Sequence, residues 1–327
     1  MTFAVLSRQA QVARLRALGR AALAAYGLQG APFRLLQHEY NTTFRVGGRY
    51  VLRVGRAHGQ TLAALASEAA WLHALAEETD LVVPAPVPTR DGALAVMASA
   101  PGVPEERACV LLRWVEGRFR DASLRPVHAR RIARVQAALH EHALGWTPPP
   151  GFTRPPASRL TARAADGPAA DEAEALRLVA ALMGPRDAQT VRDALARVRD
   201  TERALAAEPG GVALVHGDLH HENVVFAGTE ARAIDFDDCG VGPLLYDLAV
   251  TRFELTTRPA LRDALLDEYA GLRGLPPRAE EHLAALELLR RVQMVMWVLE
   301  SREHPRFRAG WRAWAREDLD ALAAAVS

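Results

Sequence analysis

The sequence predicts an α+β protein with two lobes, an N-terminal antiparallel sheet carrying one helix and a larger helical C-terminal lobe. Short β-prone runs separated by turn residues occupy the first part of the chain, whereas apolar residues recur mostly at helical spacing beyond Gly117. The length of 327 residues agrees with two domains or with one large two-lobed unit. We therefore expect a first lobe over residues 1–115 and a second lobe over residues 116–327.

The first lobe should begin with a helix at about 8–26, between the capping residue Ser7 and the helix-ending Gly27. Gly47 and Gly48 predict a two-residue hairpin turn between two of its strands. The remaining elements expected in this lobe are strands at 33–37, 43–46, 50–54, 94–97 and 110–115, and a helix at about 60–79.

The second lobe is predicted to be helical, apart from short strand-like runs near its middle at 213–215, 224–226 and 231–234. A proline-rich stretch at 147–156 predicts a loop or the boundary of an insertion. The expected helices lie at about 126–145, 171–183, 186–207, 244–256, 260–273, 278–300 and 311–325.

All basic residues of the chain are arginines: 40 of them stand against 39 acidic residues, for a net charge of +1, and there is no lysine. Mechanisms that need a Schiff-base or general-base lysine are therefore excluded. A chain so close to neutral also offers no polycationic field for non-specific nucleic-acid binding, so we expect no nucleic-acid partner.

The two cysteines, Cys109 and Cys239, lie too far apart for a CxxC metal site and do not make a disulfide framework. They predict buried thiols of a reduced, cytoplasmic protein. Arginines interrupt the N-terminal segment before a signal-peptide core can form, and no uncharged apolar run approaches the roughly 18 residues of a membrane span. We expect no membrane partner, and a homodimer is compatible with the sequence.

The segment 215–224 is the most informative of the chain, because an apolar strand there runs into a polar loop carrying Asp218 and, five positions later, Asn223. A hairpin then reverses the direction of the chain and is expected to bring Asp235 close to Asp218 and Asn223. Oxygen ligands of this kind suit Mg²⁺, whose coordination is completed by water and substrate phosphates. The spacing D-x-x-x-x-N is that of a phosphotransferase catalytic loop.

These two segments, His216-Gly217-Asp218-Leu219-His220-x-x-Asn223 and 234–238, resemble the aminoglycoside phosphotransferase and type II homoserine kinase-like family of small-molecule kinases. Further blocks that look like the family lie in its order at 50–54, 67–72, 83–86 and 246–249. The resemblance covers roughly residues 40–250. It implies a protein-kinase-like two-lobed fold and transfer of the γ-phosphoryl group from ATP, with Mg²⁺, to a hydroxyl of a small molecule.

Position by position, the resemblance implies that Asp218 is the catalytic base or the group that orients the acceptor hydroxyl. Asn223 and Asp235 would hold Mg²⁺ between the ATP phosphates. His216 would buttress this loop beside the cofactor site, and Asp247 would tie down backbone near it.

Kinase-like folds place a lysine on the third strand, paired with a glutamate on the following helix, to hold the nucleotide phosphates. Arg53 stands at that strand position here, and arginine can clamp phosphate bidentately. Glu68 lies on the otherwise apolar stripe of the helix at about 60–79, so its carboxylate needs a partner. We expect Arg53 to be that partner, with both residues at the cofactor site.

No G-x-G-x-x-G loop covers the phosphates, and small polar residues of the first hairpin, Asn41 among them, are expected to do that work. Only eleven residues separate Asp235 from Asp247, too few for a regulated activation segment, which favours a small-molecule acceptor. Acidic side chains in the second lobe could bind an amine-bearing acceptor, and a role as extra metal-site or helix-capping carboxylates is an equal alternative. The candidate acceptor residues are Asp237, Asp238 and Glu254.

Three alternatives to a small-molecule kinase remain at this stage. A metallohydrolase could use the cluster formed by His216, Asp218, His220 and His221, although no second histidine-rich loop is present. The missing lysine would suit a non-catalytic nucleotide-binding module. A serine/threonine protein kinase of the stress-response type is a third alternative, and homoserine-, choline- and aminoglycoside-like acceptors cannot be ranked.

Overall fold

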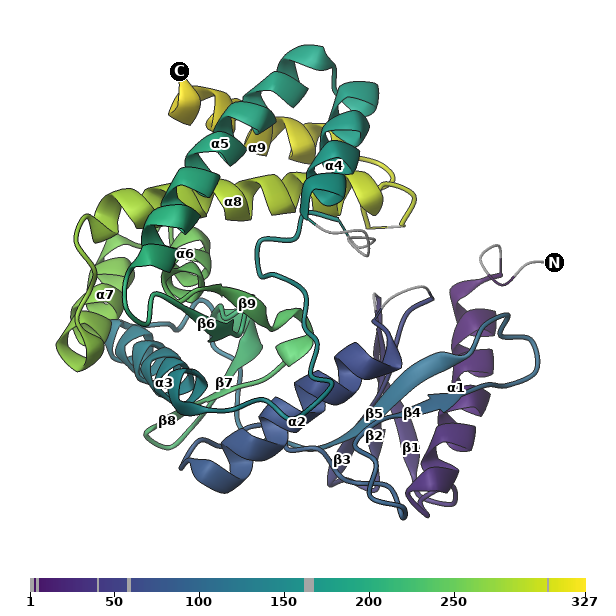
Figure 1. Ribbon diagram of the computed structural model, residues 1–327. Helices are drawn as coiled ribbons and strands as arrows, with labels where there is room; N and C mark the ends of the chain where they lie inside the picture. The colour runs from purple at the N-terminus through teal and green to yellow at the C-terminus, as the bar shows by residue number, and fades with distance from the viewer. Residues whose placement is uncertain (1–2, 4–5, 40, 58–59, 162–167, 305) are drawn as a thin grey trace.

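The computed structural model describes residues 3, 6–39, 41–57, 60–161, 168–304 and 306–327, and it has the predicted α+β architecture (Figure 1). An N-terminal lobe built on an antiparallel sheet stands beside a larger, mainly helical lobe. No helix among the described residues is both long enough and apolar enough to span a membrane.

The sheet of the first lobe has five strands in the order β1-β2-β3-β5-β4. Alternate residues of its strands face two different helices, because successive side chains of a strand point to opposite faces. Leu111 packs in the core that α1 covers, whereas Val110 and Leu112 pack in the core that α2 covers. The elements are α1 (Arg8–Ala25), β1 (Phe33–His38), β2 (Thr42–Val46), β3 (Tyr50–Val54), α2 (Leu62–Glu78), β4 (Val96–Ala98) and β5 (Arg107–Arg113).

The turn between β2 and β3 differs from the expected two-residue hairpin. Val46 pairs with Tyr50, so the turn has three residues, Gly47, Gly48 and Arg49. Both glycines have positive φ, as the sequence implied. Arg49 stays outside the β2–β3 ladder, and its carbonyl accepts a hydrogen bond from the Trp114 amide instead, at 2.8 Å.

The second lobe packs α3 against α7 and α6 against α8 around a large apolar core (Figure 1). Two small antiparallel sheets, β6 with β9 and β7 with β8, lie between these helices and the first lobe. The elements are α3 (Pro126–Gly145), α4 (Pro168–Leu182), α5 (Pro185–Ala207), β6 (Val212–Val215), β7 (Val224–Ala227), β8 (Glu230–Ala233), β9 (Gly240–Pro243), α6 (Leu245–Glu254), α7 (Pro259–Arg273), α8 (Ala279–Glu300) and α9 (Trp311–Val326).

Strand β9 was not predicted, because its sequence Gly-Val-Gly-Pro lacks a β-prone pattern. It forms because β6 offers it a partner, with Val215 opposite Gly240. Cys109 and Cys239 are both free and buried, as expected.

A connecting segment, residues 152–161, runs from the α3 side of the second lobe past α2 and toward α4 (Figure 1). The Thr153 amide donates a hydrogen bond to the Ser67 hydroxyl of α2 at 2.8 Å. The Ala157 amide donates to the Val241 carbonyl of β9 at 2.9 Å. The segment therefore touches both lobes beside the cleft between them.

Candidate active site

The cleft between the lobes has a volume of about 740 Å³ and is lined by charged residues from both sides. Strands β2 and β3 line one wall, and the loops after β6 and β8, together with α8, line the other. A cleft of this size falls within the range of pockets that bind small molecules. Its lining includes Arg53, Asp218, Asn223, Asp235, Glu254 and Arg290.

The loop after β6 is held by a buried carboxylate, as the resemblance implied for Asp247. The two carboxylate oxygens of Asp247 accept hydrogen bonds from the backbone amides of His216 and Gly217, at 2.9 and 2.8 Å. Nε2 of His140 lies 3.1 Å from the same carboxylate. Gly217 has φ of 83°, and a Cβ there would collide with the Asp238 carbonyl, so glycine lets the two loops approach.

His216 is fully buried, with 0 % of its surface exposed. Its Nε2 lies 3.1 Å from the Ile234 carbonyl oxygen, and its ring packs on Phe236 at 4.4 Å between centroids. Its Nδ1 accepts a hydrogen bond from the Asp218 amide at 3.3 Å, so His216 supports both the loop that carries Asp218 and the segment before Asp235.

Asp218 is engaged from two sides. Nη2 of Arg290, on α8, lies 2.7 Å from Oδ1 of Asp218, and Nδ2 of Asn223 donates to Oδ2 at 2.8 Å. Burial raises the pKa of Asp218, but the Arg290 guanidinium and the neighbouring His220 outweigh burial and hold the pKa below its usual range. Asp218 therefore stays ionised at neutral pH. Arg290 also lies 3.5 Å from Glu254.

Asp235 and Asn223 are the two expected metal ligands, and both line the cleft. Asp235 has a left-handed backbone (φ 62°, ψ 67°), which is uncommon for a residue other than glycine. Its side chain is 57 % exposed. Desolvation in the cleft and the adjacent Asp237 carboxylate raise the pKa of Asp235 to about 7. A divalent cation would neutralise this concentration of negative charge, so the donor set fits Mg²⁺.

Arg53 and Glu68 form the buried ion pair that the sequence predicted. Nη2 of Arg53 donates to both carboxylate oxygens of Glu68, at 2.7 and 2.6 Å, and the two residues are 5 % and 1 % exposed. Burial lowers the pKa of Arg53, but the Glu68 and Asp237 carboxylates more than reverse this and raise it. Nη1 of Arg53 lies 3.9 Å from Oδ1 of Asp235, so the pair borders the expected metal site.

Asn41 reaches across the cleft. Its Nδ2 donates to Oδ2 of Asp237 at 2.9 Å, while its Oδ1 accepts from the Arg56 amide at 3.3 Å. Nε2 of Gln60 donates to Oδ1 of Asp237 at 2.6 Å. These contacts place Asp237 where the two lobes meet.

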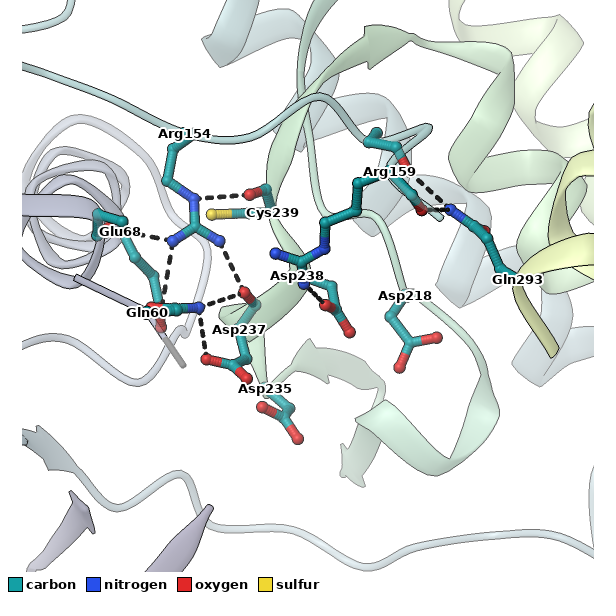
Figure 2. A network of polar contacts seen from close by, with 12 residues as sticks. Gln60, Glu68, Arg154, Arg159, Asp218, Asp235, Asp237, Asp238, Cys239 and Gln293 are labelled. Atoms are coloured by element: carbon teal, nitrogen blue, oxygen red, sulfur yellow. Dashed lines mark hydrogen bonds and ion pairs between the residues drawn. The ribbon is translucent and has the colours of Figure 1, made fainter. Parts of the chain in front are cut away.

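Asp238 and Glu254, the other expected acceptor residues, face arginines of the second lobe. Asp238 pairs with Arg159 of the connecting segment (Figure 2). The backbone carbonyls of Ala157 and Arg159 in turn accept hydrogen bonds from Gln293 of α8, at 3.0 and 2.9 Å.

Three arginines of this region were not predicted from the sequence. Arg290, Arg159 and Arg154 carry no motif, and they belong to a chain with 40 arginines. Only the tertiary structure brings them to the catalytic loops.

A family model and several solved structures are similar to this chain. Residues 33–282 match the model of a family described as the phosphotransferase enzyme family. A microcompartment-associated aminopropanol kinase has a similar structure, with a TM-score of 0.72, 26 % sequence identity and 94 % of each chain covered.

Two further solved structures show the same fold. An amicoumacin kinase, solved with AMP-PNP, Ca²⁺ and Ami, has a TM-score of 0.69 and 16 % identity, over 97 % of this chain and 95 % of that one. A choline/ethanolamine kinase family protein from Mesorhizobium loti has a TM-score of 0.63 and 20 % identity, over 94 % and 93 %. No curated protein matches the chain in sequence.

Proposed function

Because the chain belongs to the phosphotransferase enzyme family, we propose that it is a kinase that uses ATP and Mg²⁺ to phosphorylate a hydroxyl of a small amino alcohol. The family establishes a phosphotransferase, and the aminopropanol kinase supports a small molecule as its substrate. What we propose beyond this is the identity of the nucleotide, of the metal and of the acceptor. The observation that carries them is the arrangement of Arg53, Glu68, Asp235 and Asp218 around one cleft.

The nucleotide end of the cleft is assigned to the Arg53–Glu68 pair. Glu68 is hydrogen-bonded to Nη2 of Arg53, and Nη1, which lies 3.9 Å from Asp235, would be the donor for phosphate oxygens. A guanidinium is always charged and can bind phosphate through two hydrogen bonds, which makes it a competent replacement for the usual lysine. With an arginine that can hold the phosphates, the missing lysine no longer favours a non-catalytic nucleotide-binding module.

The metal would be held by Asp235 and by the amide oxygen of Asn223. The Asn223 amide nitrogen points at Asp218, which leaves the oxygen on the other side of that amide for a cation. Mg²⁺ bound here would neutralise charge on the phosphates during transfer. The residues present fit this cation, because hard oxygen donors and excess negative charge coincide.

Asp218 is assigned to the acceptor hydroxyl. Arg290 and Asn223 hold its carboxylate in one orientation, and its low pKa makes it a weak base. Its main contribution would therefore be to orient the hydroxyl in line with the γ-phosphate. Positioning of this kind accounts for most of the catalysis in phosphoryl transfer.

The acceptor end favours a small molecule with an ammonium group. Asp238 and Glu254 line this part of the cleft beside Arg159 and Arg290, and so does Trp297, whose ring already faces the Arg306 guanidinium at 5.5 Å. Carboxylates and aromatic faces both attract ammonium ions. The aminopropanol kinase, at 26 % identity over 94 % of the chain, supports the same class of acceptor.

The contacts that the histidines of the loop make disfavour the metallohydrolase alternative. Nε2 of His216 lies 3.1 Å from the Ile234 carbonyl oxygen, Nε2 of His220 lies 3.5 Å from the Asp218 carboxylate, and Nε2 of His221 lies 3.4 Å from the Asp121 carboxylate. The three histidines of the loop thus have separate partners, whereas a dinuclear zinc site would need them to converge.

The test is an acceptor screen with purified protein, ATP or GTP, and Mg²⁺, in which phosphorylated products are identified by mass spectrometry. Amino alcohols are compared with alcohols of equal size that lack the amine, with homoserine, with aminoglycosides and with a serine peptide. We expect turnover of amino alcohols and little turnover of the amine-free controls. Nucleotide binding without consumption on any acceptor would instead favour the non-catalytic module.

A further inference from the structure

Resting on the proposed kinase function, we propose that Arg154 is a positioning residue for phosphoryl transfer. It holds the backbone after Asp235 and the carboxylate of Glu68 in one arrangement (Figure 2). The Asp235 carboxylate and the Arg53 guanidinium, 3.9 Å apart, would then face each other before ligands bind.

The guanidinium of Arg154 binds backbone carbonyls of both lobes. Its Nε donates to the Cys239 carbonyl at 2.6 Å, and its Nη2 donates to the Asp237 carbonyl at 2.7 Å. Its Nη1 donates to the Ala64 carbonyl of α2 at 3.1 Å. Two of these acceptors belong to the loop that follows Asp235, and the third belongs to the helix that carries Glu68.

Arg154 and Arg53 also share one carboxylate. Nη1 of Arg154 lies 3.9 Å from Oε2 of Glu68, and that oxygen accepts from Arg53 at 2.6 Å. The Arg154 side chain is 0 % exposed. A buried cation needs this many partners to offset its lost hydration, and the rigid guanidinium fork satisfies them in one geometry only.

The contacts of the connecting segment with α2 and β9 fix the position of Arg154 between the two lobes. Beside Arg154, the Thr153 amide is bound to α2 and the Val241 amide donates to the Pro155 carbonyl at 3.2 Å. A Cβ at Gly240 would collide with the Pro155 carbonyl, so a glycine in β9 is required for this approach.

The loop needs such support because Asp235 has a left-handed backbone. A conformation of this kind persists only where surrounding contacts over-determine it. The two carbonyls bound by Arg154 lie two and four residues after Asp235, so they fix the turn that sets the direction of its carboxylate.

The test compares Arg154→Gln and Arg154→Lys with a matched control, Arg252→Gln. Arg252 is likewise buried, at 7 % exposed, and lies in the same lobe, where it pairs with Glu280 at 2.9 Å and Glu287 at 3.0 Å. Both glutamine variants remove one buried arginine, but only the first touches the Asp235 loop.

Two readouts are measured besides kinetics: the affinity for Mn²⁺ in the presence of AMP-PNP, by calorimetry, and hydrogen exchange of the amides of residues 236–241. For Arg154→Gln we expect at least about tenfold weaker Mn²⁺ binding and faster exchange in that loop. Its kcat should fall about tenfold or more, with little change in acceptor KM. Arg154→Lys should change each of these quantities less than Arg154→Gln does, because lysine keeps the positive charge but lacks the planar guanidinium with its several donors.

Wild-type Mn²⁺ affinity and loop exchange in Arg154→Gln, together with a loss of stability like that of Arg252→Gln, would overturn the proposal. If Arg154→Gln does not fold, wild-type values in Arg154→Lys would overturn it equally. A wild-type protein that binds neither Mn²⁺ nor AMP-PNP would contradict the proposed function, whereas faster loop exchange in Arg154→Gln would still support the positioning role.

Discussion

The two ends of the cleft, which are proposed to bind the nucleotide and the acceptor, contain the same pair of side chains, arginine and carboxylate, in different surroundings. At the nucleotide end, Arg53 is 5 % exposed and is bound through two hydrogen bonds by Glu68, which is 1 % exposed. At the acceptor end, Arg290 lies between Asp218 and Glu254, whose side chains are 21 % and 27 % exposed. Burial fixes the first pair before any ligand arrives, whereas the second pair retains contact with solvent and can adjust.

The largest expected effect comes from breaking the buried pair. Arg53→Met should lower kcat/KM for MgATP about a thousandfold, since both the proposed phosphate contact and the geometry of Glu68 would be lost. It should also reduce the free energy of unfolding by up to about 3–5 kcal/mol, because Glu68 loses both hydrogen bonds from Arg53 and stays buried with the Arg154 guanidinium 3.9 Å away. Steady-state kinetics and urea denaturation measure the two effects.

Arg53→Lys is the control for this prediction. Lysine restores the charge and should retain most of the stability, with a loss of about tenfold in kcat/KM because its ammonium cannot bind phosphate and Glu68 in the same fork. A stable, fully active Arg53→Met protein would mean that the nucleotide phosphates bind elsewhere.

The next largest effect is expected at the other end of the cleft. Asp218→Ala should lower kcat by about 10²–10³-fold, while the affinity for MgATP stays close to that of the wild type, because the role proposed for Asp218 is to orient the acceptor and not the nucleotide. Calorimetry with AMP-PNP separates the two quantities. Wild-type turnover in this variant would refute the assigned role.

Arg290→Gln should have a smaller effect that depends on pH. Without this guanidinium the pKa of Asp218 rises toward its ordinary value, so protonation begins to compete as the pH falls. We expect about tenfold lower kcat/KM for the acceptor at neutral pH, and a larger loss at acidic pH. A pH profile of kcat/KM measures the shift of the acidic limb.

Arg291→Gln is the matched control, because the adjacent Arg291 pairs with Asp318 at 2.6 Å. It should leave the pH profile unchanged. An identical profile in both variants would show that Arg290 does not set the ionisation of Asp218.

The sequence predicted the parts of this molecule that local patterns encode. Helix bounds followed from periodicity and caps, and the spacing of Asp218, Asn223 and Asp235 indicated one cleft. The Arg53–Glu68 pair was predicted because a carboxylate on an apolar helix face needs a cation. It is confirmed at 2.6–2.7 Å.

The remaining parts of the site depend on long-range packing. Strand β9 forms only because β6 lies beside it, and Arg290 reaches Asp218 across 72 positions of the chain. Arg154 lies in a proline-rich stretch that predicted a loop or the boundary of an insertion, and its partners include backbone carbonyls that no sequence pattern reveals. Asp237 was a candidate acceptor residue in the sequence, and no sequence pattern showed that its carboxylate is bound by Asn41 and Gln60.

The smallest expected effect concerns the stability of the metal-free protein. Asp235 has a pKa raised to about 7 when folded, above the value of about 3.9 for an unfolded aspartate, so the folded state binds its proton more tightly. The contribution of Asp235 to stability is therefore fully present below the unfolded pKa and is lost as the pH rises through about 7. The loss should be modest, since 57 % of the side chain is exposed.

Thermal unfolding between pH 5.5 and pH 8, without metal, should therefore show the wild-type Tm falling relative to that of Asp235→Asn, which cannot ionise at this position. The difference between the two proteins isolates Asp235 from other titrating groups, including His220. Mg²⁺ with ATP should remove the difference by raising the wild-type Tm most at the higher pH, because the cation binds the ionised carboxylate. Parallel Tm curves for the two proteins, with and without Mg²⁺ and ATP, would show that Asp235 neither carries a raised pKa nor binds the metal, and would move the metal site to the other carboxylates of the cleft.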